Sequence, residues 1–199
     1  MKPYYDHAGI TIYHGDCRDV LSCLGAVGFV VTDPPYPDCH VERYGYSDGL
    51  VDVLDQISVR QFVFWSAKVD FPLAYTAIHV WDKKTGCGSE YERIFERNGS
   101  SNWKVFRHYL INSTVAAMYS NDVFTGHPSQ KPQRLIRDIF AYASVDSVLL
   151  DPFCGTGVTL EVAKAFRIKA IGIEIDERYC EIAANRLEQE VLPFDAVSA

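Results

Sequence analysis

The tetrapeptide Asp33-Pro34-Pro35-Tyr36 places a carboxylate, two prolines and an aromatic ring directly after the apolar run Phe29-Val30-Val31-Thr32. The apolar run predicts a buried strand, and the prolines stiffen the loop that follows because they fix φ and lack an N–H donor. Hydrogen-bond acceptors and a flat ring then lie at a strand's carboxyl end, where open α/β sheets bind ligands. This combination suits the exocyclic amino group of a nucleobase. The alternative for these four residues alone is a structural turn with a packed tyrosine.

A glycine-bearing turn, Asp151-Pro152-Phe153-Cys154-Gly155-Thr156-Gly157, is the second candidate site. Its glycines let the backbone approach a ligand, and the helix that follows presents free N–H groups. About 20 residues further on, Glu174 ends the next predicted strand, at the spacing where a carboxylate binds ribose hydroxyls. Leu160 replaces the third glycine of a dinucleotide fingerprint, and Asp151 would repel a pyrophosphate. The pattern therefore predicts a nucleoside cofactor with a cationic end, such as S-adenosylmethionine, the alternative being a tight structural turn with an exposed acid.

The loop His127-Pro128-Ser129-Gln130-Lys131-Pro132 is the third candidate. It holds a hydroxyl and an ammonium between prolines, just before a predicted helix. Such a loop suits a carboxylate ligand, and a plain loop with a helix start is its alternative.

Strand and helix patterns alternate along the chain and must position these motifs. This alternation predicts a doubly wound, mostly parallel α/β sheet in a single domain spanning residues 1–199. The segment 83–126 lacks clear periodicity apart from a strand-like part and a mixed stretch over 105–119, so we expect it to be a short insertion. Strands are predicted at 10–14, 29–32, 61–65, 77–81, 90–96, 147–150 and 170–174, and helices at 19–24, 51–57, 71–75, 133–143, 157–166 and 177–190.

The composition is that of an ordinary globular protein, with 48% apolar and 23% charged residues in 199. No apolar run approaches the ~18 residues that a membrane span needs, and no signal peptide is recognisable. The six cysteines form no C-x-x-C pair, so we expect no metal, no disulfide framework and a reducing, cytoplasmic location.

The net charge of −7 is unevenly distributed. Residues 79–137 carry nine Lys and Arg against five acids, whereas the remainder of the chain is strongly acidic. A basic middle on an acidic scaffold predicts local phosphate binding, and an ordinary mixed surface is the alternative.

In order along the chain, the three motifs and Glu174 resemble the amino-group DNA methyltransferases of the permuted β class (the N-4/N-6 DNA methylases with a DPPY motif). In that family the catalytic motif precedes the cofactor motif, and the target-recognition segment lies between them. The resemblance covers nearly the whole chain, including Gly15-Asp16-Cys17 and Trp81-Asp82-Lys83. It implies a Rossmann-like fold that binds S-adenosylmethionine and methylates double-stranded DNA.

The resemblance also implies roles for single residues. Asp33 and the carbonyl of Pro34 would accept hydrogen bonds from the target amino group, Pro35 would hold the loop, and Tyr36 would stack on a base rotated out of the duplex. No covalent intermediate is implied, so Cys17 and Cys154 are not expected to be nucleophiles. Cofactor contacts are implied for Asp16, Cys17, Asp33, Ser129, Lys131, Asp151, Phe153, Cys154, Gly155, Thr156, Gly157, Thr159, Glu174 and Ile175. DNA contacts are expected for Lys83, Lys84, Arg93, Arg97, Lys104 and Arg107.

Aspartate at position 33 favours adenine N6 as the target, with cytosine N4 as the rival. Weaker rivals are methylation of RNA or of a protein amide, and a catalytically silent DNA-binding relative. A homodimer is compatible with the family, as is a bacterial or phage-infected host cell. A restriction-modification role and a solitary one are not separated by the sequence.

Overall fold

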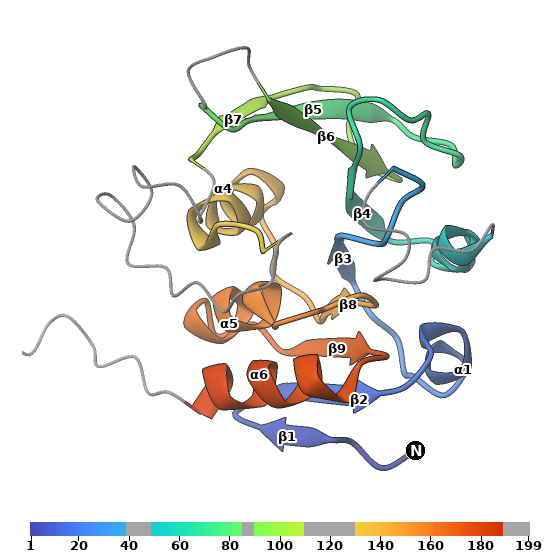
Figure 1. The fold of residues 1–199 in the computed structure, drawn as a ribbon, viewed down its shortest axis with the longest axis vertical. Coiled ribbons are helices and arrows are strands. Elements are labelled where there is room, and N and C mark those ends of the chain that lie inside the picture. Colours follow the sequence, from blue (N-terminus) through green and yellow to red (C-terminus); the bar gives the residue numbers. More distant parts are fainter. Residues whose placement is uncertain (39–48, 85–89, 110–129, 189–199) are drawn as a thin grey trace, which may run out of the picture.

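The computed structural model describes residues 1–38, 49–84, 90–109 and 130–188. These residues form a nine-stranded sheet in the order β1-β2-β9-β8-β3-β4-β6-β5-β7, with helices on both faces (Figure 1). The strands are β1 (Tyr5–His7), β2 (Ile10–His14), β3 (Phe29–Thr32), β4 (Arg60–Trp65), β5 (Ala77–Asp82), β6 (Tyr91–Arg97), β7 (Val105–Arg107), β8 (Leu149–Asp151) and β9 (Ala170–Glu174). The helices are α1 (Cys17–Leu21), the 3₁₀ helix η1 (Leu50–Gln56), α4 (Gln133–Ala143), α5 (Val158–Ala165) and α6 (Glu177–Glu188).

Strands β2, β9, β8, β3 and β4 run parallel, and their carboxyl ends define one edge of the sheet, here called the carboxyl edge. From β8 the chain passes through α5 to β9 on one side, and from β3 it passes through η1 to β4 on the other. β8 and β3 are neighbours, paired at Phe29↔Leu149 and Val30↔Leu150. Because ligands of open α/β sheets bind where the strand order reverses, the ends of β3 and β8 are the expected site.

Strand β6 is antiparallel to both of its neighbours, β4 and β5. Its first residues therefore lie at the carboxyl edge, where Tyr91 pairs with Asp82 and Arg93 with Trp65. Its last residue, Arg97, lies at the opposite edge, here called the amino edge, where it pairs with Gln61. The described part of segment 83–126 thus contributes β6 and β7 to the sheet itself.

The period-2 alternation of the strands sorts their side chains onto two faces. Phe29 and Val31 pack into one core with residues of α4, α5 and α6, whereas Val30 packs into a second core with residues of α1 and η1. Figure 1 shows α4, α5 and α6 stacked along one side of the sheet and α1 on the other. Helix α4 buries Leu135 and Ile139, which lie one turn apart.

Most predicted elements are confirmed within a few residues, and the strands 10–14 and 170–174 have their predicted bounds. The predicted helix 71–75 is wrong: this segment is irregular, although Phe71 and Leu73 are buried. The two buried residues are two positions apart rather than three or four, and the segment before them is held by the Trp65 Nε1–H, which donates to the Asp70 carbonyl at 3.2 Å. The helix predicted at 19–24 begins earlier, at Cys17, because Asp16 caps it by accepting a bond from the Arg18 N–H.

Candidate active site

A cavity of about 610 Å³ opens at the carboxyl edge, around the ends of β2, β3, β8 and β9. Its size is that of a small-molecule site. The structure brings most of the predicted residues together here, since the lining includes Asp16, Cys17, Asp33, Pro34, Pro35, Tyr36, Lys131, Asp151, Phe153, Cys154, Gly155, Thr156, Thr159, Glu174 and Ile175. Gly157 caps α5 next to this lining. Ser129 lies outside the described residues.

Asp33 follows β3 and forms an ion pair with Lys131, through Oδ2 and Nζ. Its other oxygen, Oδ1, is enclosed and has no hydrogen-bond partner among the described residues. Burial raises the pKa of Asp33, and the neighbouring Lys131 opposes that rise. The carboxylate of this cavity residue therefore has one oxygen bonded to a cation and one enclosed oxygen without a partner among the described residues.

Lys131 lies two residues before α4, and its side chain is 7% exposed. Burial lowers its pKa, but Asp33 and Glu92 together outweigh burial and hold the pKa above its ordinary value. Lys131 is predicted to hold a cofactor carboxylate. In the structure its ammonium contacts two protein carboxylates, the second being Glu92 Oε2 at 3.3 Å, and its contact with the cofactor stays a prediction.

Glu92 is a site residue that the sequence reasoning missed. It is buried on β6 and also pairs with Lys83, whose Nζ lies 2.7 Å from Glu92 Oε1. Burial raises the pKa of Glu92, but the two lysines outweigh it, so the net pKa is lowered. The alternation of side chains along β6 could have indicated that Glu92 is buried, because Glu92 lies on the same strand face as the core residue Ile94.

Asp151, the last residue of β8, is 3% exposed and accepts a 2.7 Å hydrogen bond from the Thr32 hydroxyl. The N–H of Phe153 also donates to Asp151 Oδ1, at 3.2 Å. Burial raises the pKa of Asp151 to about 7, although the hydroxyls of Thr32 and Thr159 oppose that rise. A buried carboxylate poised near neutrality is suited to a cationic ligand group.

The turn after β8 is fixed to the end of β9. Glu174 accepts backbone N–H bonds from Gly155 at 2.9 Å and from Asp176 at 2.8 Å, one on each carboxylate oxygen. Because each oxygen has a further lone pair, Glu174 is oriented by the backbone and can still accept from a ligand hydroxyl. Gly155 and Gly157 have φ of 49° and 76°, the left-handed region that favours glycine.

The cysteines of the cavity are poor nucleophiles. Burial raises the pKa of Cys17 to about 11, and burial raises that of Cys154 well above its ordinary value. Cavity residues that the sequence did not reveal include Arg18, which follows the Gly15-Asp16-Cys17 motif, and Leu50 and Tyr179, which lie in no motif.

Tyr36 is 8% exposed and packs against Trp65, with ring centroids 5.4 Å apart at 54°. One side of its ring is therefore occupied by the core, while the residue still lines the cavity. Stacking of Tyr36 on an extruded base stays a prediction.

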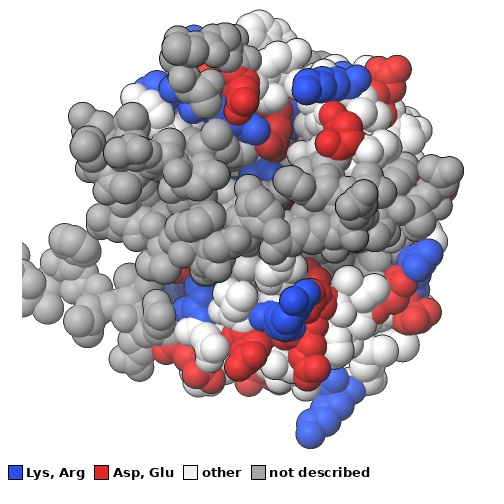
Figure 2. All heavy atoms as spheres, viewed as in Figure 1, with Lys and Arg blue, Asp and Glu red and all other residues white. Residues whose placement is uncertain are grey.

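The six basic residues expected to contact DNA separate into two groups. Lys83, Lys84 and Arg107 lie near the carboxyl edge, since β5 and β7 end there. Arg107 is exposed, with 71% of its side chain accessible and a 3.5 Å ion pair to Asp82. Figure 2 shows basic and acidic side chains interspersed on the visible described surface rather than one broad basic patch.

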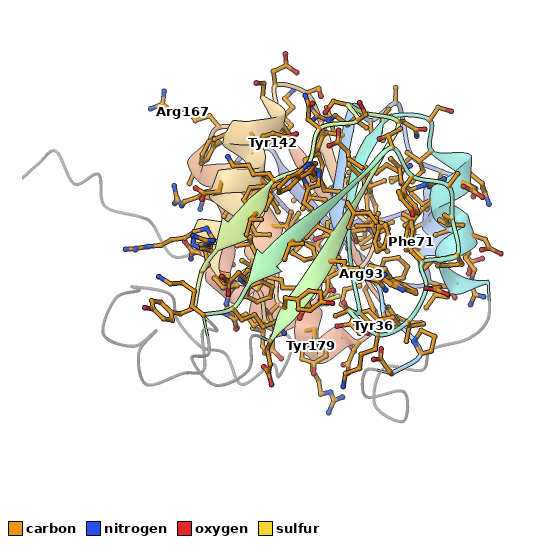
Figure 3. All side chains as sticks on the ribbon, turned by 90° about the horizontal axis from the view of Figure 1, so that it is seen from above. Tyr36, Phe71, Arg93, Tyr142, Arg167 and Tyr179 are labelled. Carbon is orange, nitrogen blue, oxygen red and sulfur yellow. The ribbon has the colours of Figure 1, made fainter. Side chains whose placement is uncertain are left out.

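The other three residues are placed differently, and their DNA role stays a prediction. The Arg97 guanidinium is buried at the amino edge, on Asp55 and on Gln61 Oε1 at 3.1 Å. The Lys104 carbonyl accepts from the Val80 N–H partway along β5, but its ammonium extends toward the amino edge, with Nζ 5.2 Å from the Tyr142 ring centroid. Figure 3 shows Tyr142 at one end of the strands and Tyr36 at the other. Arg93 is at the carboxyl edge, but its guanidinium is engaged by the carbonyls of Ser66 and Val69.

Residues 58–185 match the N6/N4 DNA methylase family profile. The chain therefore belongs to the DNA methylase family.

Curated relatives agree with this membership. The chain is 27% identical over 257 aligned positions to the Type II methyltransferase M.ScaI of Streptomyces caespitosus, which covers 95% of this chain and 84% of that protein. It is 39% identical over 80 residues to the Type II methyltransferase M.HpaI of Haemophilus parainfluenzae, and this alignment covers 40% of this chain and 26% of that protein. The DNA adenine methyltransferase YhdJ of Escherichia coli is 41% identical over 71 residues, 35% of this chain and 24% of that protein. The chain thus spans most of one of these relatives and about a quarter of the other two.

Solved structures share the fold. The PvuII DNA methyltransferase, described as cytosine-N4-specific, superposes with a TM-score of 0.69 and 13% identity over 96% of this chain and 91% of that one. The M1.HpyAVI–SAM complex superposes with a TM-score of 0.59 and 19% identity over 90% of this chain and 100% of that one. The architecture is a doubly wound, mostly parallel Rossmann-like methyltransferase fold, with the Asp33 motif before the glycine turn in the chain.

Within the described ranges, no group of three or more metal-binding side chains could hold an ion. No helix in the same ranges is long and apolar enough to cross a membrane.

Proposed function

We propose that the chain is a β-class DNA methyltransferase that transfers a methyl group from S-adenosylmethionine to the N6 amino group of adenine in double-stranded DNA. The observation that carries this proposal is the position of Asp33. Asp33, whose Oδ1 is enclosed and has no hydrogen-bond partner among the described residues, lines the same cavity as Asp151 and Glu174. An acceptor for an amino group thus adjoins a set of groups suited to a nucleoside with a cationic end.

The chemical groups that line the cavity suit S-adenosylmethionine. Asp151 is a buried carboxylate suited to an ammonium group, and Glu174 is held by two backbone N–H groups with lone pairs free for ribose hydroxyls. A Cβ added to Gly155 would meet nothing within 4 Å, so the turn leaves open space beside it. S-adenosylmethionine, when bound, supplies an electrophilic methyl group on a sulfonium sulfur, and S-adenosylhomocysteine is the product when the S–C bond breaks. The amino nitrogen that gains the methyl group loses one proton, which its acceptor Asp33 can take up. Ile175, 66% exposed at the mouth, would flank the adenine.

Asp33 and the Pro34 carbonyl would act on the target amino group. The lone pair of an aromatic amine is delocalised into its ring, which makes the nitrogen a poor nucleophile. Two acceptors draw this nitrogen toward tetrahedral geometry and aim its lone pair at the methyl group. Proximity and alignment then supply much of the acceleration, without a covalent enzyme intermediate. Tyr36 would stack on the extruded base and offset part of its unstacking cost.

The aspartate at position 33 and the similarity to YhdJ support adenine as the target base. The test is incubation of the protein with unmodified bacterial DNA and methyl-labelled cofactor, followed by nucleoside analysis. We expect label in N6-methyladenine. Label in N4-methylcytosine would assign the rival base, and DNA that binds without gaining label would overturn the enzymatic proposal. Modification-detecting sequencing of the product then gives the target sequence.

A further inference from the structure

Four charged side chains of alternating sign form a chain at the carboxyl edge. Asp33 pairs with Lys131, Lys131 lies 3.3 Å from Glu92, and Glu92 lies 2.7 Å from Lys83. These residues come from four separate segments: the loop after β3, the turn before α4, strand β6 and the end of β5. All four side chains are largely enclosed: 22% of the Asp33 side chain, 7% of Lys131, 12% of Glu92 and 15% of Lys83 are exposed.

The ion pair with Lys131 engages the Asp33 carboxylate, which is the hydrogen-bond acceptor that the proposed function requires. Oδ2 of Asp33 holds the Lys131 ammonium, so an incoming amino group meets a carboxylate whose charge is already neutralised. A buried ammonium cannot leave one carboxylate without another counter-charge, because an unpaired buried charge is costly. Glu92 Oε2 supplies that counter-charge, since it lies 3.3 Å from the same ammonium.

We propose that Glu92 is a positioning residue that takes over the Lys131 ammonium when the target amino group reaches Asp33. The inference rests on the proposed role of Asp33 as the acceptor of that amino group. Glu92 acts through Lys131 and touches neither the base nor the cofactor.

The surroundings of Lys131 suit a short displacement between the two carboxylates. Its Nζ lies 5.1 Å from the Phe64 ring centroid and 6.0 Å from that of Trp81. Aromatic faces attract a cation without fixing it to one point. The ammonium can therefore change carboxylate partners while it stays enclosed.

The electrostatics of Asp33 provide a test that needs no turnover. The charged groups that face Asp33 are Lys131, Glu92 and Lys83, with Asp151 at the end of the adjacent strand β8. In Glu92→Gln a like charge is removed and Glu92 no longer competes with Asp33 for Lys131, so the pKa of Asp33 falls. In Lys83→Gln a cation is removed and Glu92 attracts Lys131 more strongly, so the pKa of Asp33 rises.

The experiment is a ¹³C NMR titration of the Asp33 carboxyl in the free, full-length protein, assigned with Asp33→Asn. We expect a decrease of about one pH unit in Glu92→Gln and an increase of similar size in Lys83→Gln. Glu90→Gln is the matched control, because Glu90 is an exposed acid one residue before β6, and it should leave the titration unchanged. Lys83→Gln replaces a partly buried ammonium by a neutral polar group and keeps the test available if Glu92→Gln folds poorly.

Methyl transfer completes the test. In Glu92→Gln we expect kcat/KM for DNA to fall about tenfold, with cofactor affinity and thermal midpoint close to wild type. A purely structural role for Glu92 would lower the midpoint without shifting the Asp33 titration downward. The inference about Glu92 is overturned if Glu92→Gln methylates DNA at the wild-type rate or leaves the Asp33 titration unchanged. In that case the proposed function still stands if Asp33→Asn is inactive. An active Asp33→Asn overturns both.

Discussion

Thr32 and Asp151 are joined by a 2.7 Å hydrogen bond between the last residues of β3 and β8. The bond crosses the point at which the strand order reverses. It couples the proposed base side of the cavity, which begins at Asp33, to the proposed cofactor side, which begins at Asp151. The two halves of the reaction centre are therefore held in register by the sheet rather than by a loop.

Cofactor affinity should depend on pH through Asp151. Its pKa of about 7 means that the carboxylate is charged above neutrality and protonated below it. Attraction for a cationic cofactor group is thus present at pH 8 and lost as the pH falls through 7. We expect the Kd for S-adenosylmethionine, measured by calorimetry, to rise about tenfold from pH 8 to pH 6. A flat profile in the wild type would contradict the role of Asp151.

Asp151→Asn is the control for this titration. It should bind cofactor weakly and without pH dependence over the same range. The stability of the free protein should change with pH in the opposite direction to cofactor affinity. The pKa of Asp151 in the folded protein lies above the unfolded value of 3.8, so the free energy of unfolding falls as the pH rises between these two values. At pH 8 the free Asp151→Asn protein should therefore melt at a higher temperature than wild type, which separates lost binding from unfolding.

Asp33→Ala should abolish methyl transfer and leave cofactor binding largely intact. The substitution removes an acceptor that acts on the target amino group, and we expect a loss of about 10²–10³-fold or more in kcat. Lys131 keeps Glu92 as a partner in this variant, so its ammonium is not left unpaired. Loss of cofactor binding with residual methyl transfer would contradict the role of Asp33 as the acceptor of the target amino group.

DNA binding should depend on basic residues at the carboxyl edge and not on those at the amino edge. Replacing Lys84 and Arg107 with glutamine should weaken binding and reduce the salt slope by about one for each phosphate that is no longer neutralised. Lys104→Gln is the matched control, because Lys104 lies over Tyr142 at the other edge. Fluorescence anisotropy at several salt concentrations measures both quantities. An equal effect of all three substitutions would argue against this division.

Gly157→Ala should destabilise the free protein. Gly157 has φ of 76°, and an added Cβ would lie 2.8 Å from the Ala183 Cβ of α6. Backbone strain and overpacking together predict a loss of about 1–3 kcal/mol in the free energy of unfolding by urea. Gly25→Ala is the comparison, because a Cβ there meets nothing within 4 Å, and it should change stability by less than about 0.5 kcal/mol.

The parallel part of the fold and the core of the site were predictable from sequence for one physical reason. Apolar runs that end in Asp33, Asp151 and Glu174 predict buried strands, and the ends of parallel strands meet at one edge. The same logic fails for β6, because alternation assigns side chains to faces but does not reveal which strands are neighbours. The insertion of β6 between β4 and β5 is a tertiary choice. That choice placed Glu92 at the site and buried Arg97 at the far edge.

The antiparallel course of β6 has a consequence for how such a protein can vary. Lys84 and Glu90 flank the connection from β5 to β6, and the Lys83 N–H donates to the Glu90 carbonyl at 3.2 Å. Tyr109 lies near Lys84, with its ring centroid 4.4 Å from the lysine Nζ, and Gln130 lines the cavity. Chain added between Lys84 and Glu90, or between Tyr109 and Gln130, thus begins and ends on the side that carries Asp33. At these two connections one segment can be replaced by another without altering a strand pairing among the described residues.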